Sequence, residues 1–124
     1  MSIAVTTDEL GRTLTGFAFA YLLTIGDDAR PHVTAVSPTW DGRRLRVSDL
    51  GRRTRANATI RPEVTLVWPP ADPGGHSLIV DGTGVVGDDE LAVAVTRAVL
   101  HRAAAAPAPV PVDGACAADC VEIT

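Results

Sequence analysis

The sequence predicts a mainly β fold, an antiparallel barrel with peripheral helices, and two observations carry this prediction. Short segments rich in β-branched or alternating apolar residues follow one another at hairpin distances. The strand–helix–strand rhythm that builds a parallel sheet does not occur along the chain. The 124 residues fit one domain, so residues 1–124 are expected to fold as a single unit.

The first half of the chain predicts one helix and three strands. A helix is expected from Thr6 to about Leu14, because Thr6 and Glu9 have the spacing of a capping box and Gly16 follows. Segments 31–40 and 43–48 read as strands joined by a hairpin at Asp41-Gly42, which completes a three-stranded antiparallel meander. The first strand of the meander, 17–25, alternates and is expected to share one apolar face, with Tyr21 in the core: Phe17, Phe19, Tyr21, Leu23 and Ile25.

The second half predicts two helices separated by two strands. A helix starting near residue 48 ends before Pro62, and strands are expected at 63–68 and 76–86. The sequence leaves open the role of loop 69–76 between them. Gly82 and Gly84 indicate a bulge or a close approach. A helix from residue 88 is expected because Leu91, Val95 and Val99 recur every four residues, and a Pro-rich segment, 106–112, then precedes a short final strand.

Composition excludes several classes of function. The net charge of −4 argues against a nucleic-acid partner. The chain has no apolar run long enough to span a membrane and begins without the pattern of a signal peptide, so a cytoplasmic protein is expected. Cys116 and Cys120 are then expected to be thiols. Their spacing, without a second pair, does not favour zinc; a thiol-based sensor is a weaker alternative.

The stretch SDLGRRTRANA, residues 48–58, carries the chemistry. It places Arg52, Arg53 and Arg55 at a helix start, where the helix dipole already contributes positive charge. A bound phosphate would neutralise both the arginines and the positive end of the helix dipole. Thr54 would add a hydroxyl, and Asn57 lies about one turn further on. The alternative is a solvated surface cluster, since all 11 basic residues of the chain are arginine.

The order of several short motifs resembles the pyridoxamine 5′-phosphate oxidase-like family of flavin-binding proteins. The matching stretches are Pro31-His32-Val33, Trp40-Asp41-Gly42, Val47-Ser48, the cluster from Arg52 to Asn57, and residues 62–66. This resemblance implies an antiparallel, Greek-key-like split β-barrel of the FMN-binding type. It also implies a homodimer with two FMN sites at the subunit interface.

The resemblance implies cofactor-binding residues by position. The phosphate would be held by Ser48, Arg52, Arg53, Thr54, Arg55 and Asn57. The flavin ring would lie along 33–36 and 46–48, which adds Val33, Thr34 and His32, the last as a donor to a flavin carbonyl. For His32 a strand residue near an edge is the alternative. His76 would enter a partner's pocket or be a solvated loop imidazole, and Trp40 and Trp68 are expected in the core or at the dimer interface.

These features predict an FMN-dependent oxidoreductase that transfers hydride to or from a small organic substrate, without a metal. A deazaflavin coenzyme is the alternative cofactor. A non-catalytic dimeric module that binds or sequesters a flavin, deazaflavin or haem is the alternative function. Flavin chemistry belongs to the cofactor, so the absence of an obvious acid–base set does not argue against an enzyme.

Overall fold

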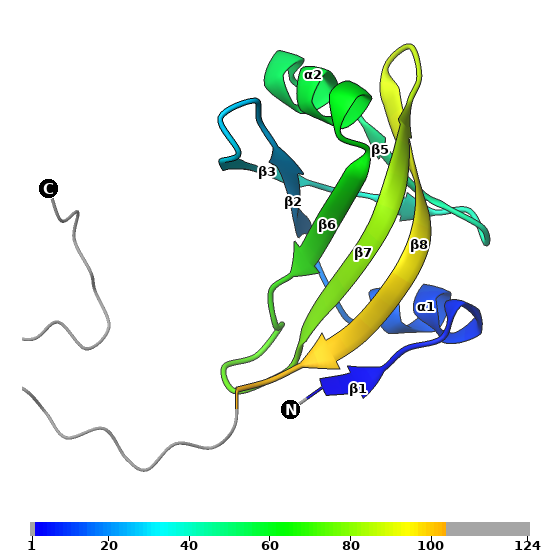
Figure 1. Ribbon diagram of the computed structural model, residues 1–124. Coiled ribbons are helices and arrows are strands. Elements are labelled where there is room, and N and C mark those ends of the chain that lie inside the picture. Colours follow the sequence, from blue (N-terminus) through cyan, green and yellow to red (C-terminus); the bar gives the residue numbers. More distant parts are fainter. Residues whose placement is uncertain (1, 104–124) are drawn as a thin grey trace, which may run out of the picture.

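The computed structural model describes residues 2–103, so the Pro-rich segment, the expected final strand, Cys116 and Cys120 lie outside the described residues. The described part is one curled antiparallel sheet with two helices (Figure 1). The helices are α1 (Thr7–Leu14) and α2 (Arg52–Ile60). The strands are β1 (Ser2–Ala4), β2 (Ala20–Ile25), β3 (Pro31–Val36), β4 (Thr39–Trp40), β5 (Leu45–Ser48), β6 (Glu63–Trp68), β7 (Ser77–Val86) and β8 (Glu90–His101).

The sheet runs in the order β3-β2-β6-β7-β8-β5-β4, with β1 paired to the other end of β8. The strands at its two edges, β3 and β4, are therefore neighbours in the sequence. The expected meander is wrong, because β3 pairs with β2 alone while β4 and β5 form a separate hairpin. Ser37 and Pro38 interrupt the predicted strand 31–40, since proline has no N–H for a ladder bond. The mainly β, split-barrel architecture is confirmed.

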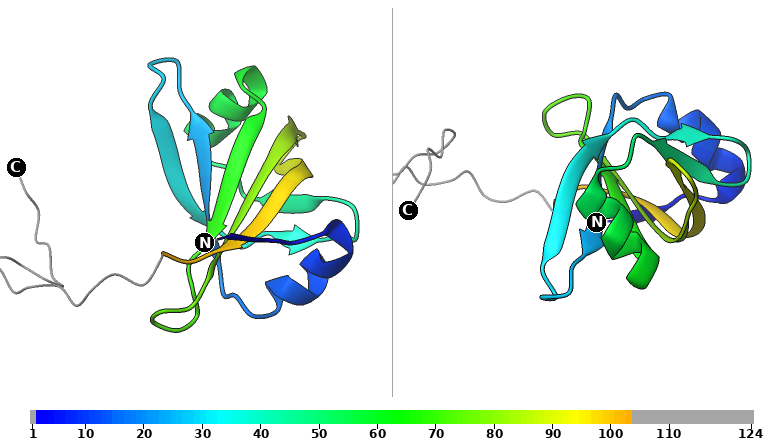
Figure 2. Two further views of the ribbon diagram at one scale, coloured as in Figure 1. Left: turned by 60° about the horizontal axis from the view of Figure 1, so that its bottom comes forward. Right: turned by 90° about the horizontal axis from the view of Figure 1, so that it is seen from above.

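The helices lie at opposite ends of the barrel (Figure 1). Viewed from above, α2 lies across one end, between β3 on one side and β7 and β8 on the other (Figure 2). The capping-box prediction for α1 is confirmed, because the Glu9 carboxylate accepts hydrogen bonds from the Thr6 N–H at 3.0 Å and hydroxyl at 2.8 Å. Neither helix among residues 2–103 is long and apolar enough to cross a membrane.

The helix expected from residue 88 is wrong, since Glu90–His101 is the longest strand, β8. The inward side chains Leu91 and Val93 alternate with period two. At Asp81/Gly82 the pairing of β7 with β8 then shifts, and Thr96 has no partner in the register. This bulge changes the parity of the inward face, so that Ala98 and Val99 are both buried. Residues four apart share a face in a strand as well as in a helix, so the recurrence of Leu91, Val95 and Val99 fits both.

The expected face of β2 is also wrong. Ala20, Leu22 and Thr24 are fully buried, whereas Tyr21 is 39% exposed on the opposite face. Leu45 and Val47 point inward, and Trp68 is a core residue. The core is thus built from leucine, valine and alanine of the concave face, and the aromatic face of β2 points outward.

Candidate functional site

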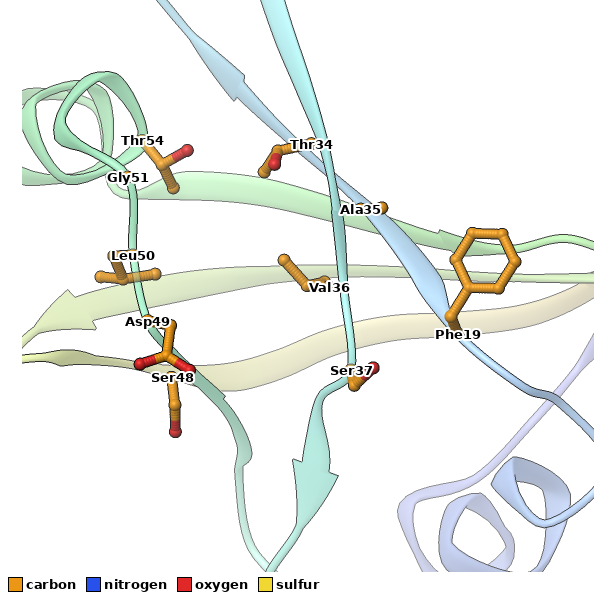
Figure 3. Close-up of a pocket in the computed structure, with 10 residues that line it drawn as sticks. All are labelled: Phe19, Thr34, Ala35, Val36, Ser37, Ser48, Asp49, Leu50, Gly51 and Thr54. Atoms are coloured by element: carbon orange, nitrogen blue, oxygen red, sulfur yellow. The ribbon is translucent and has the colours of Figure 1, made fainter.

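A cavity of about 370 Å³ lies between β3 and the start of α2. One wall is the second half of β3, and the other is the segment that joins β5 to α2. Val36 and Leu50 face one another across it from these two walls (Figure 3). The volume lies in the range of small-molecule sites, and the apolar middle is bordered by hydroxyl groups.

The start of α2 borders this cavity and is uncapped. Gly51 occupies the N-cap position and offers no side chain, so no side-chain hydrogen bond closes the first turn. The first backbone bond of the helix runs from the Arg55 N–H to the Gly51 carbonyl at 3.0 Å. The N–H groups of Arg52, Arg53 and Thr54 are therefore left to solvent or a ligand.

Thr54 is the most informative polar side chain of the site. It is 1% exposed, lines the cavity, and has no hydrogen-bond partner for its hydroxyl among residues 2–103. Its hydroxyl points across the cavity toward Thr34 of β3 (Figure 3). Because this hydroxyl is unpaired and opens onto the cavity, an acceptor placed between these threonines could receive its hydrogen bond.

Two further polar residues border the cavity. Ser48 lies at the end away from Thr54, and its hydroxyl points away from that threonine (Figure 3). Asp49 lines the wall with a φ of 57°, a left-handed conformation that aspartate adopts more readily than most residues. Its carboxylate can only accept hydrogen bonds when ionised, so it suits ligand hydroxyl or N–H groups rather than phosphate.

The structure divides the sequence-predicted residues into groups. Thr34, Ser48 and Thr54 line the first cavity, while His32, Arg53 and Asn57 line a second one of about 580 Å³ on the other side of the α2 start. Arg52 and Val33 line neither cavity. Arg55 also turns away, because its guanidinium donates to the backbone carbonyls of Gly87 and Asp88 in the β7–β8 turn, the former at 2.8 Å.

Some arginines near the site form ion pairs with carboxylates, and others do not. Arg52 and Arg53 make no ion pair with a described residue. Arg46, by contrast, is held by Asp41 at 2.7 Å and by Glu90 at 2.6 Å, and these two carboxylates raise its pKa. The start of α2 thus carries two arginines that are unpaired within the described part of the chain, and Asp49 is the carboxylate of the cavity wall.

Comparison with known proteins supports this assignment of the fold. An uncharacterized protein of Mycobacterium bovis and one of Mycobacterium tuberculosis are each 43% identical to the chain, over 91% of its length and 90% of theirs. The chain belongs to the family of these proteins. No known family profile matches it.

Solved structures with the same fold are more distant relatives. HupZ of Group A Streptococcus superposes with a TM-score of 0.64 at 13% identity, covering 82% of this chain and 98% of that one. The FAD-binding protein of Mycobacterium smegmatis gives 0.60 at 17%, covering 82% and 100%. A Clostridium acetobutylicum protein of the pyridoxinephosphate oxidase family gives 0.61 at 13%, covering 79% and 91%. The fold of the family is therefore that of pyridoxamine 5′-phosphate oxidase-like proteins.

Several residues that line the first cavity were not predicted from the sequence. Asp49, Leu50 and Gly51 belong to the short connection between a strand and a helix, where site residues often gather. Phe19 precedes β2 and reaches the cavity from the outward aromatic face. The position of Asp49 between a strand end and an uncapped helix was the only signal available for it.

His76 lies in the connection between β6 and β7 and borders neither of these two cavities. It lines a third cavity together with Thr13 and Phe17. The residue is half-buried, and its Nε2 is buried without a hydrogen-bond partner among the described residues, so the imidazole is only partly solvated.

Proposed function

We propose that this protein is a flavin-dependent oxidoreductase that binds the phosphate of FMN at the start of α2. The observation that carries the proposal is the unpaired hydroxyl of Thr54, a residue that is 1% exposed and lines the first cavity beside an uncapped helix N-terminus. Phosphate is the ligand that such a helix start favours, because free N–H groups and the dipole both act on it. The FAD-binding proteins of Mycobacterium smegmatis and Mesorhizobium loti, which have this fold, support a flavin as the ligand class.

The residues present fit this ligand. Backbone N–H groups of Arg52 and Arg53 and the hydroxyls of Thr54 and Thr34 would hold the phosphate. Asp49 would accept hydrogen bonds from the hydroxyl groups of the polyol chain, and Ser48 would accept or donate one. Val36 and Leu50 would exclude water from the flavin ring. When bound, a flavin supplies the hydride chemistry itself. The role of the chain is therefore to bind and orient it and to leave one ring face open to a small organic substrate.

We further propose that the active unit is a homodimer formed through the outward face of β2 and β3. Val33 is 51% exposed, Tyr21 39% and Phe19 36%. Tyr21 lies opposite Ala35 on β3 and Val67 on β6, so the apolar side chains form one continuous patch. Because Phe19 and Ala35 also line the first cavity, a partner docked here would close its open side.

The first experiment records the visible spectrum of the purified protein and titrates FMN by fluorescence quenching. Saturable binding at one FMN per chain supports the proposal, and bleaching of the bound flavin by NAD(P)H supports the oxidoreductase. A protein that ignores FMN contradicts it. Binding of a deazaflavin coenzyme instead would revise the cofactor, and binding without turnover would favour the non-catalytic module.

A matched pair of variants tests the site itself. Thr54→Val removes only the unpartnered hydroxyl and should weaken FMN binding about tenfold or more, the worth of one hydrogen bond to a charged group. Its thermal stability should be unchanged, since the hydroxyl makes no hydrogen bond with a described residue. Thr59→Val on the exposed side of α2, whose hydroxyl bonds the Arg55 carbonyl at 2.7 Å, is the control. Equal FMN affinity for wild type and Thr54→Val would show that the phosphate lies elsewhere.

A further inference from the structure

The second cavity, of about 580 Å³, adjoins the first but has a different character. It lies between the β2–β3 turn, the beginning of β3 and the exposed side of α2. Its side chains include Arg30, His32 and Arg53, together with Asp27 and Asp28. Nothing in the binding of a flavin monophosphate at Thr54 requires it.

The two cavities share both of their walls. Arg53 and Thr54 are consecutive on α2, so their α-carbons are about 3.8 Å apart, and one residue faces each cavity. On β3, His32 lines the second cavity and Thr34 the first, two residues apart and therefore on the same face of the strand. A ligand that leaves the first cavity along α2 thus enters the second.

Charges in the second cavity are left uncompensated. Asp27 is already paired with Arg61 at 3.0 Å, and Asp28 accepts the backbone N–H of Arg30 at 3.0 Å. The guanidinium groups of Arg30 and Arg53 have no carboxylate partner among the described residues. Two free cations therefore face the single carboxylate of Asp28, and an anionic group would be stabilised between them.

The wall that carries Arg53 is rigid. Asn57, one turn further along α2, is 8% exposed and donates from Nδ2 to the Thr24 hydroxyl at 3.1 Å. This contact holds α2 against β2, directly beneath the second cavity. Arg53 is consequently presented from a fixed backbone, which lowers the entropy lost when it binds a ligand.

We propose that the second cavity binds a second phosphate, so that this chain prefers a flavin dinucleotide with a diphosphate linkage over a flavin mononucleotide. This inference rests on the proposed function, because the first phosphate is the one placed at the start of α2. The adjoining phosphate lies between the guanidinium groups of Arg53 and Arg30. Pro31 and His32 then provide a surface without negative charge for the nucleoside beyond it.

The test compares FAD with FMN by isothermal titration calorimetry on the full chain. Wild type should bind FAD at least about tenfold more tightly than FMN, and Arg30→Ala/Arg53→Ala should remove most of that preference. FMN affinity should change less than about threefold in the same variant, because its phosphate is held by backbone N–H groups and Thr54. Arg44→Ala, an exposed arginine of the β4–β5 loop, is the matched control and should leave both affinities unchanged.

The outcomes separate this inference from the proposed function. If FMN binds and FAD binds no better, the second cavity does not take a phosphate and the inference alone is overturned. The same follows if the double variant weakens FMN and FAD equally, which would place both arginines on the first phosphate. If neither flavin binds, the proposed function fails as well. Both arginines are exposed, so unfolding of the variant is not expected, and far-UV circular dichroism checks it.

Discussion

The side-chain amide of Asn57 donates a hydrogen bond to the hydroxyl of Thr24 over 3.1 Å, joining α2 to β2 inside the barrel. Both side chains are buried, Thr24 completely. Asn57 thus fixes the position of the helix that carries the proposed phosphate site. Its structural role is visible without any ligand.

Replacing Thr24 by valine tests this contact. Thr24→Val keeps the shape but leaves the buried amide of Asn57 without its acceptor, which should lower the free energy of unfolding by about 1–3 kcal/mol. Urea denaturation measures the change. An unaltered midpoint would mean that Asn57 finds another acceptor and that the contact adds little. The unchanged stability expected for Thr54→Val makes the two threonines an internal comparison.

Arg55 should contribute to stability rather than to ligand affinity. Arg55→Ala removes the bonds to the Gly87 and Asp88 carbonyls and should cost about 1 kcal/mol, with FMN affinity almost unchanged. Arg52→Ala, which loses no contact with a described residue, should stay within about 0.5 kcal/mol of wild type. Differential scanning calorimetry measures the stability of the two variants, and an FMN titration measures their affinity. A large loss of FMN affinity in Arg55→Ala would return this arginine to the phosphate site.

The β4–β5 hairpin should be sensitive to acid through Asp41. The backbone N–H groups of Arg44 and Arg43 and the Arg46 side chain lower the pKa of Asp41 far below its usual value. A depressed pKa stabilises the fold above the unfolded-state pKa, about 3.9, and this contribution is lost as the pH falls below that value.

The measurement is a series of urea midpoints between about pH 2 and pH 7, the window set by the unfolded-state pKa. Wild type should lose stability on acidification more steeply than Asp41→Asn. Parallel curves for the two proteins would show that the carboxylate contributes nothing. Because Asp41 and Arg46 are both exposed, the difference in slope is expected to be small.

Gly82 should not tolerate a side chain. A Cβ there would lie 2.5 Å from Val93 Cγ1 and 2.6 Å from the Ala94 carbonyl oxygen, beside the bulge. Gly82→Ala should therefore lower stability by about 1–3 kcal/mol or prevent folding. Gly16→Ala, where the nearest atom is the Thr13 carbonyl oxygen at 3.6 Å, is the matched substitution. Similar melting temperatures for the two variants would mean that β8 moves at little cost to accommodate the added methyl group.

The proposed dimer is tested on its apolar face. Val33→Glu places a charge in the patch of β2 and β3 and should produce monomers, measured by analytical ultracentrifugation. Val85→Glu alters another exposed valine, 66% accessible and far along β7, and should leave assembly as it is. If wild type is itself a monomer at micromolar concentration, the proposed interface is not formed.

Local signals in the sequence predicted the parts of the fold that depend on near neighbours. The capping box at Thr6, the hairpin at Asp41 and the stop before Pro62 all act within a few residues. The face of β2 was predicted wrongly because both of its faces carry apolar residues, and local alternation cannot tell which face packs inward. The mistaken helix at Leu91 has a local cause, since residues four apart share a face in a strand as well as in a helix and the spacing of Leu91, Val95 and Val99 fits both.

The candidate site was predictable to a similar extent. The arginine-rich helix start lies beside the first cavity, and Thr54 and Ser48 line it. The separation of Arg53 from Thr54 into two cavities depends on how α2 lies against β3, which no local pattern encodes. The position of Arg55 could not be predicted for the same reason, because its hydrogen-bond partners lie more than 30 residues away in the β7–β8 turn.

The first cavity takes its walls from β3 and from the end of β5, which stand at nearly opposite ends of the sheet order. Neither wall is in place until every strand between them has paired. A ligand held there therefore recognises only the completely folded chain, and partly folded forms have no affinity for it. At a concentration of one hundred times Kd such a ligand adds about 2.7 kcal/mol to the stability of all strands together. Cofactor supply would then set the lifetime of the whole protein against proteolysis.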